Sequence, residues 1–102
     1  MPAFRKYELE VPATQTTGKE FPCRNLDQKW VQIGGTMGGG RNLRIEGTMD
    51  DVGWEEVNGG ITATDLYPVC QTLSKVRIRT ARVGSGNTTA TLVGRDVETY
   101  PR

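Results

Sequence analysis

The stretch KVRIRTARVGSGNTTATLVGR, residues 75–95, carries the clearest fold signal in this chain. Val76 and Ile78 alternate with Arg77 and Arg79, and this period of two places apolar and charged side chains on opposite faces of a strand. The segment GSGN is typical of a turn, and the alternation resumes after it. We therefore predict that the two halves of this stretch form a β-hairpin.

A second glycine-rich segment, GGTMGGG at 34–40, lies between two further alternating stretches, KWVQI at 29–33 and RNLRIEGT at 41–48. We predict a hairpin here as well, with the glycines as a mobile tip. Phosphate-binding glycine loops carry Gly-Lys-Ser/Thr and lead into a helix, and neither feature follows this segment.

Shorter β signals fill the rest of the chain. We predict a strand that begins at Trp54, an Asn-Gly-Gly turn at 58–60 and another strand from Ile61, while Pro68 interrupts the helix candidate at 64–74. The whole chain then holds about seven to eight short strands. This number is typical of an all-β, antiparallel β-sandwich of the jelly-roll or immunoglobulin-like type.

The length of 102 residues fits one domain with one core, 1–102, in which residues 1–28 form an amino-terminal strand and arm. Thirteen Lys and Arg against twelve Asp and Glu leave a net charge of +1, too small a charge for non-specific nucleic-acid binding. We find no apolar run long enough for a membrane span or a signal peptide. We therefore expect synthesis in the cytoplasm, and neither nucleic acid nor membrane as a partner.

The chain has no histidine and two cysteines, Cys23 and Cys70, so the ligands of a zinc site are missing. Two reduced, buried thiols are favoured over a disulfide in a protein made in the cytosol. The acidic pairs at 50–51 and 55–56 lack the calcium-loop pattern, and adjacent residues of a strand point to opposite faces. We therefore expect no metal, no cofactor and no enzymatic activity.

Lys75, Arg77 and Arg79 recur at every second residue, with Arg82 close by, so a strand would place them on one face. This basic stripe is either a solvated face or a surface that pairs with the carboxylates of a partner, for which the planar guanidinium group is well suited. No aromatic residue alternates with these arginines to stack on bases, which disfavours nucleic acid.

Trp30 and Trp54 allow two interpretations. Large aromatic side chains in a small β domain usually pack inside it, but on an exposed face they can stack on sugar rings. A carbohydrate-binding sandwich is therefore an alternative function.

Residues 29–57, KWVQIGGTMGGGRNLRIEGTMDDVGWEEV, resemble a pattern of small phage virion proteins: a strand, a glycine-rich turn, a strand that ends in a Leu-x-Gly-Ser-x-Asp-Gly-like turn, and a Trp that opens the next strand. Residues 75–95 are similar to the closing hairpin of the same proteins. The family's turn carries Asp-Gly where this chain has Asp50-Asp51, which suggests a longer loop. The resemblance implies a β-sandwich protein of the capsid surface (a decoration or cement protein), or an accessory protein of the tail or baseplate.

On this basis we expect a non-enzymatic structural protein of the virion. The first hypothesis is a capsid decoration protein that binds the major capsid protein of the assembled shell as a homo-oligomer. The alternatives are a tail or baseplate accessory protein and the carbohydrate-binding module. The expected partner contacts are Phe4, Arg5, Tyr7, Phe21, Arg77, Arg79 and Arg82. For Phe21 a second interpretation stays open, in which its ring caps the core.

Residues 12–28 are polar and contain two prolines, which makes a long connection for a compact domain. Before it, Tyr7, Leu9 and Val11 alternate with charged residues. A connection of this length can serve as a tether. We therefore predict that residues 1–11 pair with another copy of the chain or with the shell protein.

Overall fold

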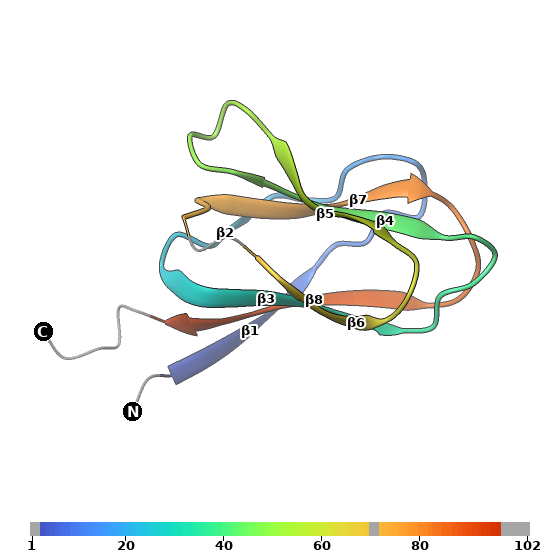
Figure 1. The fold of residues 1–102 in the computed structure, drawn as a ribbon, viewed down its shortest axis with the longest axis horizontal. Coiled ribbons are helices and arrows are strands. Elements are labelled where there is room, and N and C mark those ends of the chain that lie inside the picture. The colour runs from blue at the N-terminus through green and yellow to red at the C-terminus, as the bar shows by residue number, and fades with distance from the viewer. Residues whose placement is uncertain (1–2, 70–71, 97–102) are drawn as a thin grey trace, which may run out of the picture.

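The computed structural model describes residues 3–69 and 72–96, and this part of the chain contains eight β-strands and no helix (Figure 1). The strands are β1 (Ala3–Leu9), β2 (Phe21–Pro22), β3 (Leu26–Gly35), β4 (Asn42–Thr48), β5 (Glu55–Ile61), β6 (Asp65–Pro68), β7 (Lys75–Arg82) and β8 (Thr88–Asp96). Sheet A has the order β1-β8-β3-β6, sheet B has the order β2-β7-β4-β5, and the pairings within both sheets are antiparallel. The two sheets form two layers (Figure 1), which confirms the predicted β-sandwich.

The strand order is that of a jelly roll. β4 and β5 form a hairpin in the middle of the chain, and outside it β3 pairs with β6, β2 with β7 and β1 with β8. The chain thus resembles one long hairpin whose successive strand pairs lie alternately in sheet B and sheet A. Of the two sandwich types that the sequence left open, the structure shows the jelly roll.

Alternating apolar side chains fill the space between the two sheets. Val31 and Ile33 of β3 and Leu92 of β8 face Val76 and Ile78 of β7 across this core, and all five are almost completely buried. Burial of each such side chain stabilises the fold by about 1.5–3 kcal/mol. The period of two in the sequence therefore identified these core positions correctly.

Both predicted hairpins are wrong in their pairing. β3 lies in sheet A and β4 in sheet B, while β7 lies in sheet B and β8 in sheet A. The glycine-rich segments that follow β3 and β7 do not turn the chain back within one sheet. Each of them crosses from one sheet to the other, at the same end of the sandwich (Figure 1).

The two crossing loops are hydrogen-bonded to each other. Gly38 and Ser85 exchange backbone hydrogen bonds of 3.0 and 2.8 Å, and the amide of Thr36 donates to the carbonyl oxygen of Asn87 at 2.9 Å. A side chain at Gly84 would place its Cβ 2.1 Å from the carbonyl oxygen of Gly38. The expected mobile tip is therefore corrected: the loop packs against its partner, and glycine is needed for the close approach of the two backbones.

The predicted turn at Asn58, Gly59 and Gly60 is also wrong, because these residues lie inside β5. Gly60 has a φ of 65°, and the register between β4 and β5 shifts beside Asn58. The glycines thus allow an irregularity in an edge strand rather than a reversal of the chain. The link to sheet A comes after Ile61.

The amino-terminal strand pairs within its own chain. β1 is in register with β8 along its whole length, from Ala3 opposite Asp96 to Leu9 opposite Ala90. β1 therefore completes the sheet of its own chain, with its other edge outermost in sheet A. Pairing of residues 1–11 with another copy of the chain or with the shell protein stays a prediction. Sequence reasoning missed the pairing of β1 with β8 because it joins the two ends of the described chain.

The polar connection after β1 is not a free tether. Its backbone runs along β7: the amide of Gly18 donates to the carbonyl oxygen of Ile78, and the amide of Thr80 donates to the carbonyl oxygen of Thr16. The segment then enters β2, where Phe21 lies opposite Val76. Its contacts are made by backbone groups, which have no signature in side-chain hydrophobicity, so the sequence suggested an arm.

Cys23 follows β2 and is completely buried. Burial raises the pKa of its thiol to about 11, against the opposing effect of the positive charge of Lys29. This agrees with the predicted role of Cys23 as a small apolar group. Cys70 lies outside the described residues, and the predicted state of the thiol pair lies outside them as well.

Candidate functional site: the outer face of sheet A

The outer face of sheet A carries an unusual row of apolar side chains. In the registers of β8, β3 and β6, Val93 lies opposite Trp30, and Trp30 lies opposite Pro68. Leu66 lies two residues from Pro68 on the same face of β6. We call the surface formed by these four residues the Trp30 face.

Exposure shows that this row faces solvent. Trp30 is 39% exposed and Leu66 is 48% exposed, Pro68 is exposed, and Val93 is half-buried between its neighbours. Antiparallel sheets with one solvated face normally carry polar residues there. Contiguous exposed apolar side chains on adjacent strands are instead typical of a surface that another molecule covers.

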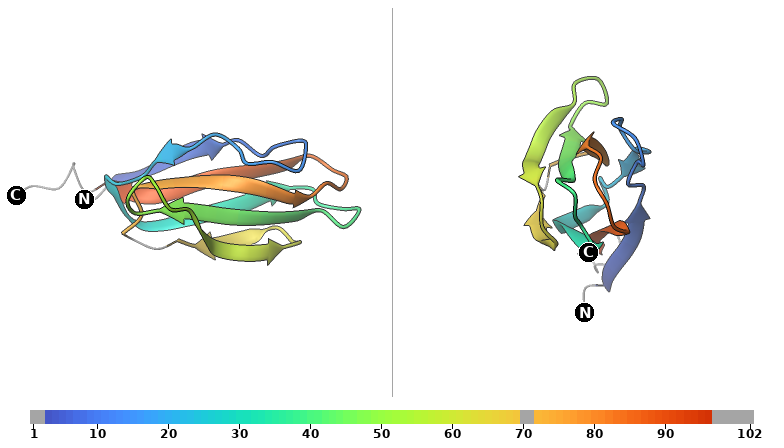
Figure 2. Two further views of the ribbon diagram at one scale, coloured as in Figure 1. Left: turned by 90° about the horizontal axis from the view of Figure 1, so that it is seen from above. Right: turned by 90° about the vertical axis from the view of Figure 1, so that its right-hand side faces the viewer.

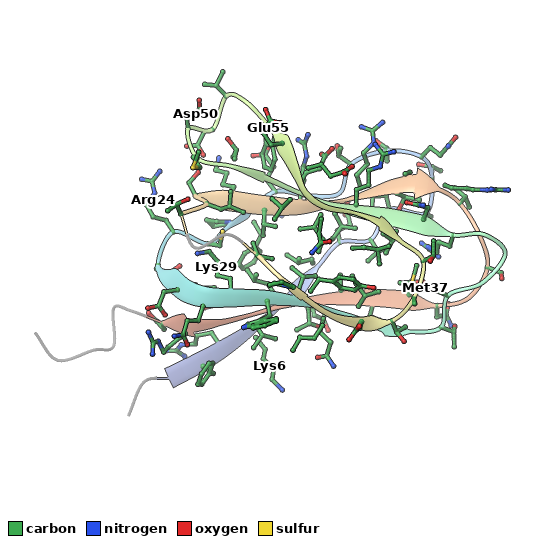
Figure 3. The ribbon with its side chains drawn as sticks, in the orientation of Figure 1. Lys6, Arg24, Lys29, Met37, Asp50 and Glu55 are labelled. Carbon is green, nitrogen blue, oxygen red and sulfur yellow. The ribbon has the colours of Figure 1, made fainter. Side chains whose placement is uncertain are left out.

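A polar border surrounds the row. On β1, Lys6 lies opposite Val93, and Figure 3 shows its side chain pointing away from the sandwich. Along β3, Gln32 follows Trp30 by two residues, and Asp27 precedes Trp30 on the far side of the bulge. Asp27 accepts two hydrogen bonds of 2.8 Å from the guanidinium group of Arg95, and these bonds hold the pKa of Asp27 below its usual value. An apolar centre with a polar rim is the usual anatomy of a protein interface.

A β-bulge directs Trp30 outward. Leu26 and Val31 are both buried although they are five positions apart, and in a regular strand such residues would face opposite sides. The register with β8 shifts between Asp27 and Trp30, and Gln28 has a φ of 46°. The extra residue restores the inward direction of Val31 and leaves Trp30 on the outside.

Lys29 occupies the inner side of this bulge. Its side chain is 1% exposed and lies between the two layers (Figure 3), and its Nζ donates a 2.7 Å hydrogen bond to the carbonyl oxygen of Leu26. A buried ammonium group is tolerated only when its hydrogen-bonding groups are engaged. Lys29 thus closes the bulge from within and helps to place Trp30.

The basic stripe lies on the outer face of sheet B, where the chain supplies part of its own counter-charge. Arg77 donates a 2.8 Å hydrogen bond to Glu46 on β4, and its guanidinium carbon lies 3.9 Å from the ring centroid of Trp54. Lys75 lies 3.5 Å from a carboxylate oxygen of Glu20. Trp54 is therefore covered on one face by Arg77 and is a poorer platform than Trp30.

Arg79 and Arg82 continue the stripe and are exposed. Within the described ranges 3–69 and 72–96, neither has an ion pair. Arg79 lies opposite Arg44 in the register of β7 and β4, and Arg44 itself pairs with Glu56 at 3.2 Å. The interpretation as a partner contact therefore applies to the end of the stripe with Arg79 and Arg82. Arg77 makes its contacts with Glu46 and Trp54 of its own chain.

The predicted contacts of the amino-terminal region fall in two places. Phe4 is 63% exposed and lies opposite Arg95, beside the Trp30 face, whereas Arg5 pairs with Asp96 at 3.2 Å. The rings of Tyr7 and Phe21 have centroids 4.8 Å apart, and both pack against the core of their own chain. The predicted contact residues are thus not gathered into one site by the fold.

Sequence reasoning missed Leu66, Pro68 and Val93 as surface residues. A signal existed for Val93, because it follows Leu92, and two adjacent apolar residues of one strand cannot both face the core. No local signal indicates that β8, β3 and β6 are neighbours, because they are far apart in the sequence.

Across the ranges 3–69 and 72–96, no group of three or more His, Cys, Asp and Glu side chains could hold a metal ion. A search of the same residues for a helix able to cross a membrane found none. A groove of about 400 Å³ lies between β1 and β2, and both apolar and charged residues line it: Leu9, Phe21 and Pro22, together with Glu8, Glu10, Lys19 and Glu20.

Comparison with known proteins supports the fold. No protein-family model matches the sequence, and a search of curated proteins gives no match. Among solved structures, the SPBc2 prophage-derived protein YomS is similar, with a TM-score of 0.68 over 94% of this chain and 96% of that chain. The two sequences are 15% identical, so the similarity establishes a shared fold.

Proposed function

We propose that this protein is a non-enzymatic structural component of a phage particle that works by binding other proteins, and that it is a capsid decoration protein. The observation that carries the proposal is the Trp30 face, an exposed apolar row across three adjacent strands. Two further observations support it. Jelly rolls are frequent among viral capsid domains, and a similar fold occurs in a protein derived from a prophage.

The chemistry of the Trp30 face suits attachment to a large assembly. A tryptophan at the centre of an interface commonly contributes a large share of its binding energy, and a polar border excludes water around it. A surface of a few apolar residues gives a modest affinity for each site. Many copies on a repeating shell compensate for this modest affinity, because their contributions add up. Each copy binds only the assembled form of the shell and therefore stabilises that form.

The test is binding to capsid shells that lack this protein, measured by co-sedimentation. Replacement of the central ring in Trp30→Ala should weaken binding by about 30-fold or more, the usual effect of removing a dominant interface aromatic. Val52→Ala is a matched control, because Val52 is 84% exposed and lies at the β4–β5 turn, away from sheet A. Equal binding of Trp30→Ala and wild type would exclude this face as the attachment surface.

A tail or baseplate location is the alternative within the same class. Electron microscopy of particles incubated with a gold-labelled protein distinguishes the two locations directly. Label on the head surface supports the decoration protein, and label confined to the tail supports the accessory protein. In both cases, gold-labelled Trp30→Ala protein should leave the particles unlabelled.

A carbohydrate-binding module is the second candidate, favoured by the exposed ring of Trp30 beside the amide of Gln32. Jelly rolls also include lectin domains. The chain contains two tryptophans, so Trp54→Phe leaves Trp30 as the single reporter. Quenching or a blue shift of its fluorescence on titration with oligosaccharides, competed by free sugar, would support this candidate over the decoration protein.

A further inference from the structure

Among the described residues, the sandwich has four edge strands, and three of them are unsuited to pairing with another strand. β6 has four residues and ends at Pro68, and β2 has two residues and includes Pro22. β5 is interrupted by Gly59 and Gly60 and by shifts of register against β4. Short length, proline and irregularity are the usual ways in which proteins protect their sheet edges.

The fourth edge, β1, has none of these features. Its seven residues, Ala3–Leu9, contain neither Pro nor Gly, and their register with β8 is continuous. β1 is the outermost strand of sheet A and lies at the margin of the molecule (Figure 2). Every second residue of such a strand directs its N–H and C=O groups away from the sheet, where they are available to another strand.

We propose that two copies of the chain join edge to edge through β1, in antiparallel orientation around a two-fold axis perpendicular to sheet A. Charge determines the register. Such an axis runs midway between the two β1 strands. The inner and outer faces of the two sheets stay aligned only if one residue of β1 lies directly opposite the same residue of the other copy, beside the axis. An axis at Arg5, Lys6 or Glu8 would oppose two like charges, which destabilises a strand pair.

An axis at Tyr7 avoids this conflict and creates attraction. Lys6 then lies opposite Glu8 of the partner subunit, and Glu8 lies opposite Lys6 of the partner subunit. Neither Lys6 nor Glu8 has an ion pair within the described residues, so both are available. Arg5 is already held by Asp96 of its own chain, at 3.2 Å. Two reciprocal ion pairs on the outer face therefore select this register.

The dimer would have one continuous sheet of two copies of sheet A, joined at the β1 strands. Both Trp30 faces would then lie on the same side of this sheet. The two β3 strands would be five strand spacings apart, roughly 24 Å. The dimer itself does not depend on the proposed function, but its use as a bivalent platform for a repeating shell does.

Charge reversal tests the register. Analytical ultracentrifugation over a wide concentration range should give a dimer for the wild type. Lys6→Glu alone, or Glu8→Lys alone, should weaken dimerisation by about tenfold, because each change replaces both attractive pairs with like charges. The double variant Lys6→Glu/Glu8→Lys should restore dimerisation to within about threefold of wild type, because the pairs re-form with exchanged signs.

Arg24→Glu is the control for Lys6→Glu, because it makes the same change of charge away from β1. Arg24 is exposed in the loop before β3. Circular dichroism and the melting temperature show whether each variant is folded. A wild type that is monomeric at all concentrations overturns the proposal. So does a double variant that is folded but no more dimeric than the single ones.

Cross-linking gives a second measurement that does not depend on variants. A carbodiimide joins a lysine to a carboxylate in contact, and a mixture of ¹⁴N- and ¹⁵N-labelled chains separates links between chains from links within one. A mixed-label link between Lys6 and Glu8 supports the register, and its absence in a dimer overturns it. If the wild type is monomeric and still binds shells, only the dimer proposal fails. If it is dimeric and does not bind shells, only the proposed function fails.

Discussion

The ammonium group of Lys29 donates a hydrogen bond to the carbonyl oxygen of Leu26, 2.7 Å away, inside the β-bulge that directs Trp30 to the surface. The contact joins a buried charged residue to the geometry of the candidate interaction face. The first prediction concerns this contact.

Lys29→Met keeps most of the buried stem but removes the donor to the Leu26 carbonyl group. We expect a loss of about 1–3 kcal/mol in the free energy of unfolding, the cost of a buried acceptor without a partner. Lys29→Ala should cost about 2–5 kcal/mol, because it also leaves a cavity. Urea denaturation measures both values, with the exposed residue Lys19, changed to Ala, as the control. If Lys29→Met equals or exceeds the wild type in stability, the hydrogen bond does not offset the burial of the charge.

The second prediction concerns the two crossing loops. Gly84→Ala would bring a Cβ to 2.1 Å from the carbonyl oxygen of Gly38, so the two backbones must separate. We expect a loss of about 1–3 kcal/mol, the usual range for local backbone strain, and a melting temperature lower by several degrees. Gly53→Ala is a matched control, because a Cβ added at Gly53 would meet nothing within 4 Å and the φ of this residue is not positive. An unchanged melting temperature for Gly84→Ala would show that the loops are not packed against each other.

The third prediction concerns the pH dependence of the β4–β5 turn. The amides of Gly53 and Val52, then the hydroxyl group of Thr48, donate to the carboxylate of Asp50 and lower its pKa below the usual value. Because the pKa is lower in the folded state, the stabilisation is complete above the unfolded value of about 3.9 and is lost as the pH falls through the folded value. Carbon-13 NMR titration of the side-chain carboxyl groups should give a midpoint for Asp50 below the unfolded value. A midpoint at or above that value would contradict the hydrogen-bonded turn.

The fourth prediction separates the two parts of the basic stripe. Arg77→Ser removes the hydrogen bond to Glu46 and the contact with Trp54, and should cost about 1–2 kcal/mol of stability, given the partial exposure of the pair. Arg79→Ser should change stability by less than about 0.5 kcal/mol, as is usual at exposed sites. If the exposed end of the stripe binds an acidic partner, Arg79→Ser should instead weaken assembly, and more so at low salt. Equal stability of both variants would show that Arg77 does not support its own sheet.

The local sequence determined which residues form strands and which side chains fill the core. Val76, Ile78, Leu43 and Ile45 were predicted as alternating apolar positions and are completely buried. The prediction succeeded because alternation is a property of a single strand, and burial follows from it whatever the neighbouring strand is. The number of strands and the sandwich class follow from the same local pattern.

Only the tertiary structure decided which strands are neighbours. A glycine-rich link permits both a turn within one sheet and a crossing to the other, and the local sequence does not distinguish them. Of the sequential strands in the described part of this jelly roll, only β4 and β5 pair. The links after β3 and β7 therefore both cross between the sheets, and each stabilises the other through Gly38 and Ser85. The Trp30 face depends on the same long-range order, because Val93, Trp30 and Pro68 become adjacent only when β8, β3 and β6 lie side by side. The packing of the whole sandwich determines which distant strands become neighbours, and no single segment of the sequence contains this information.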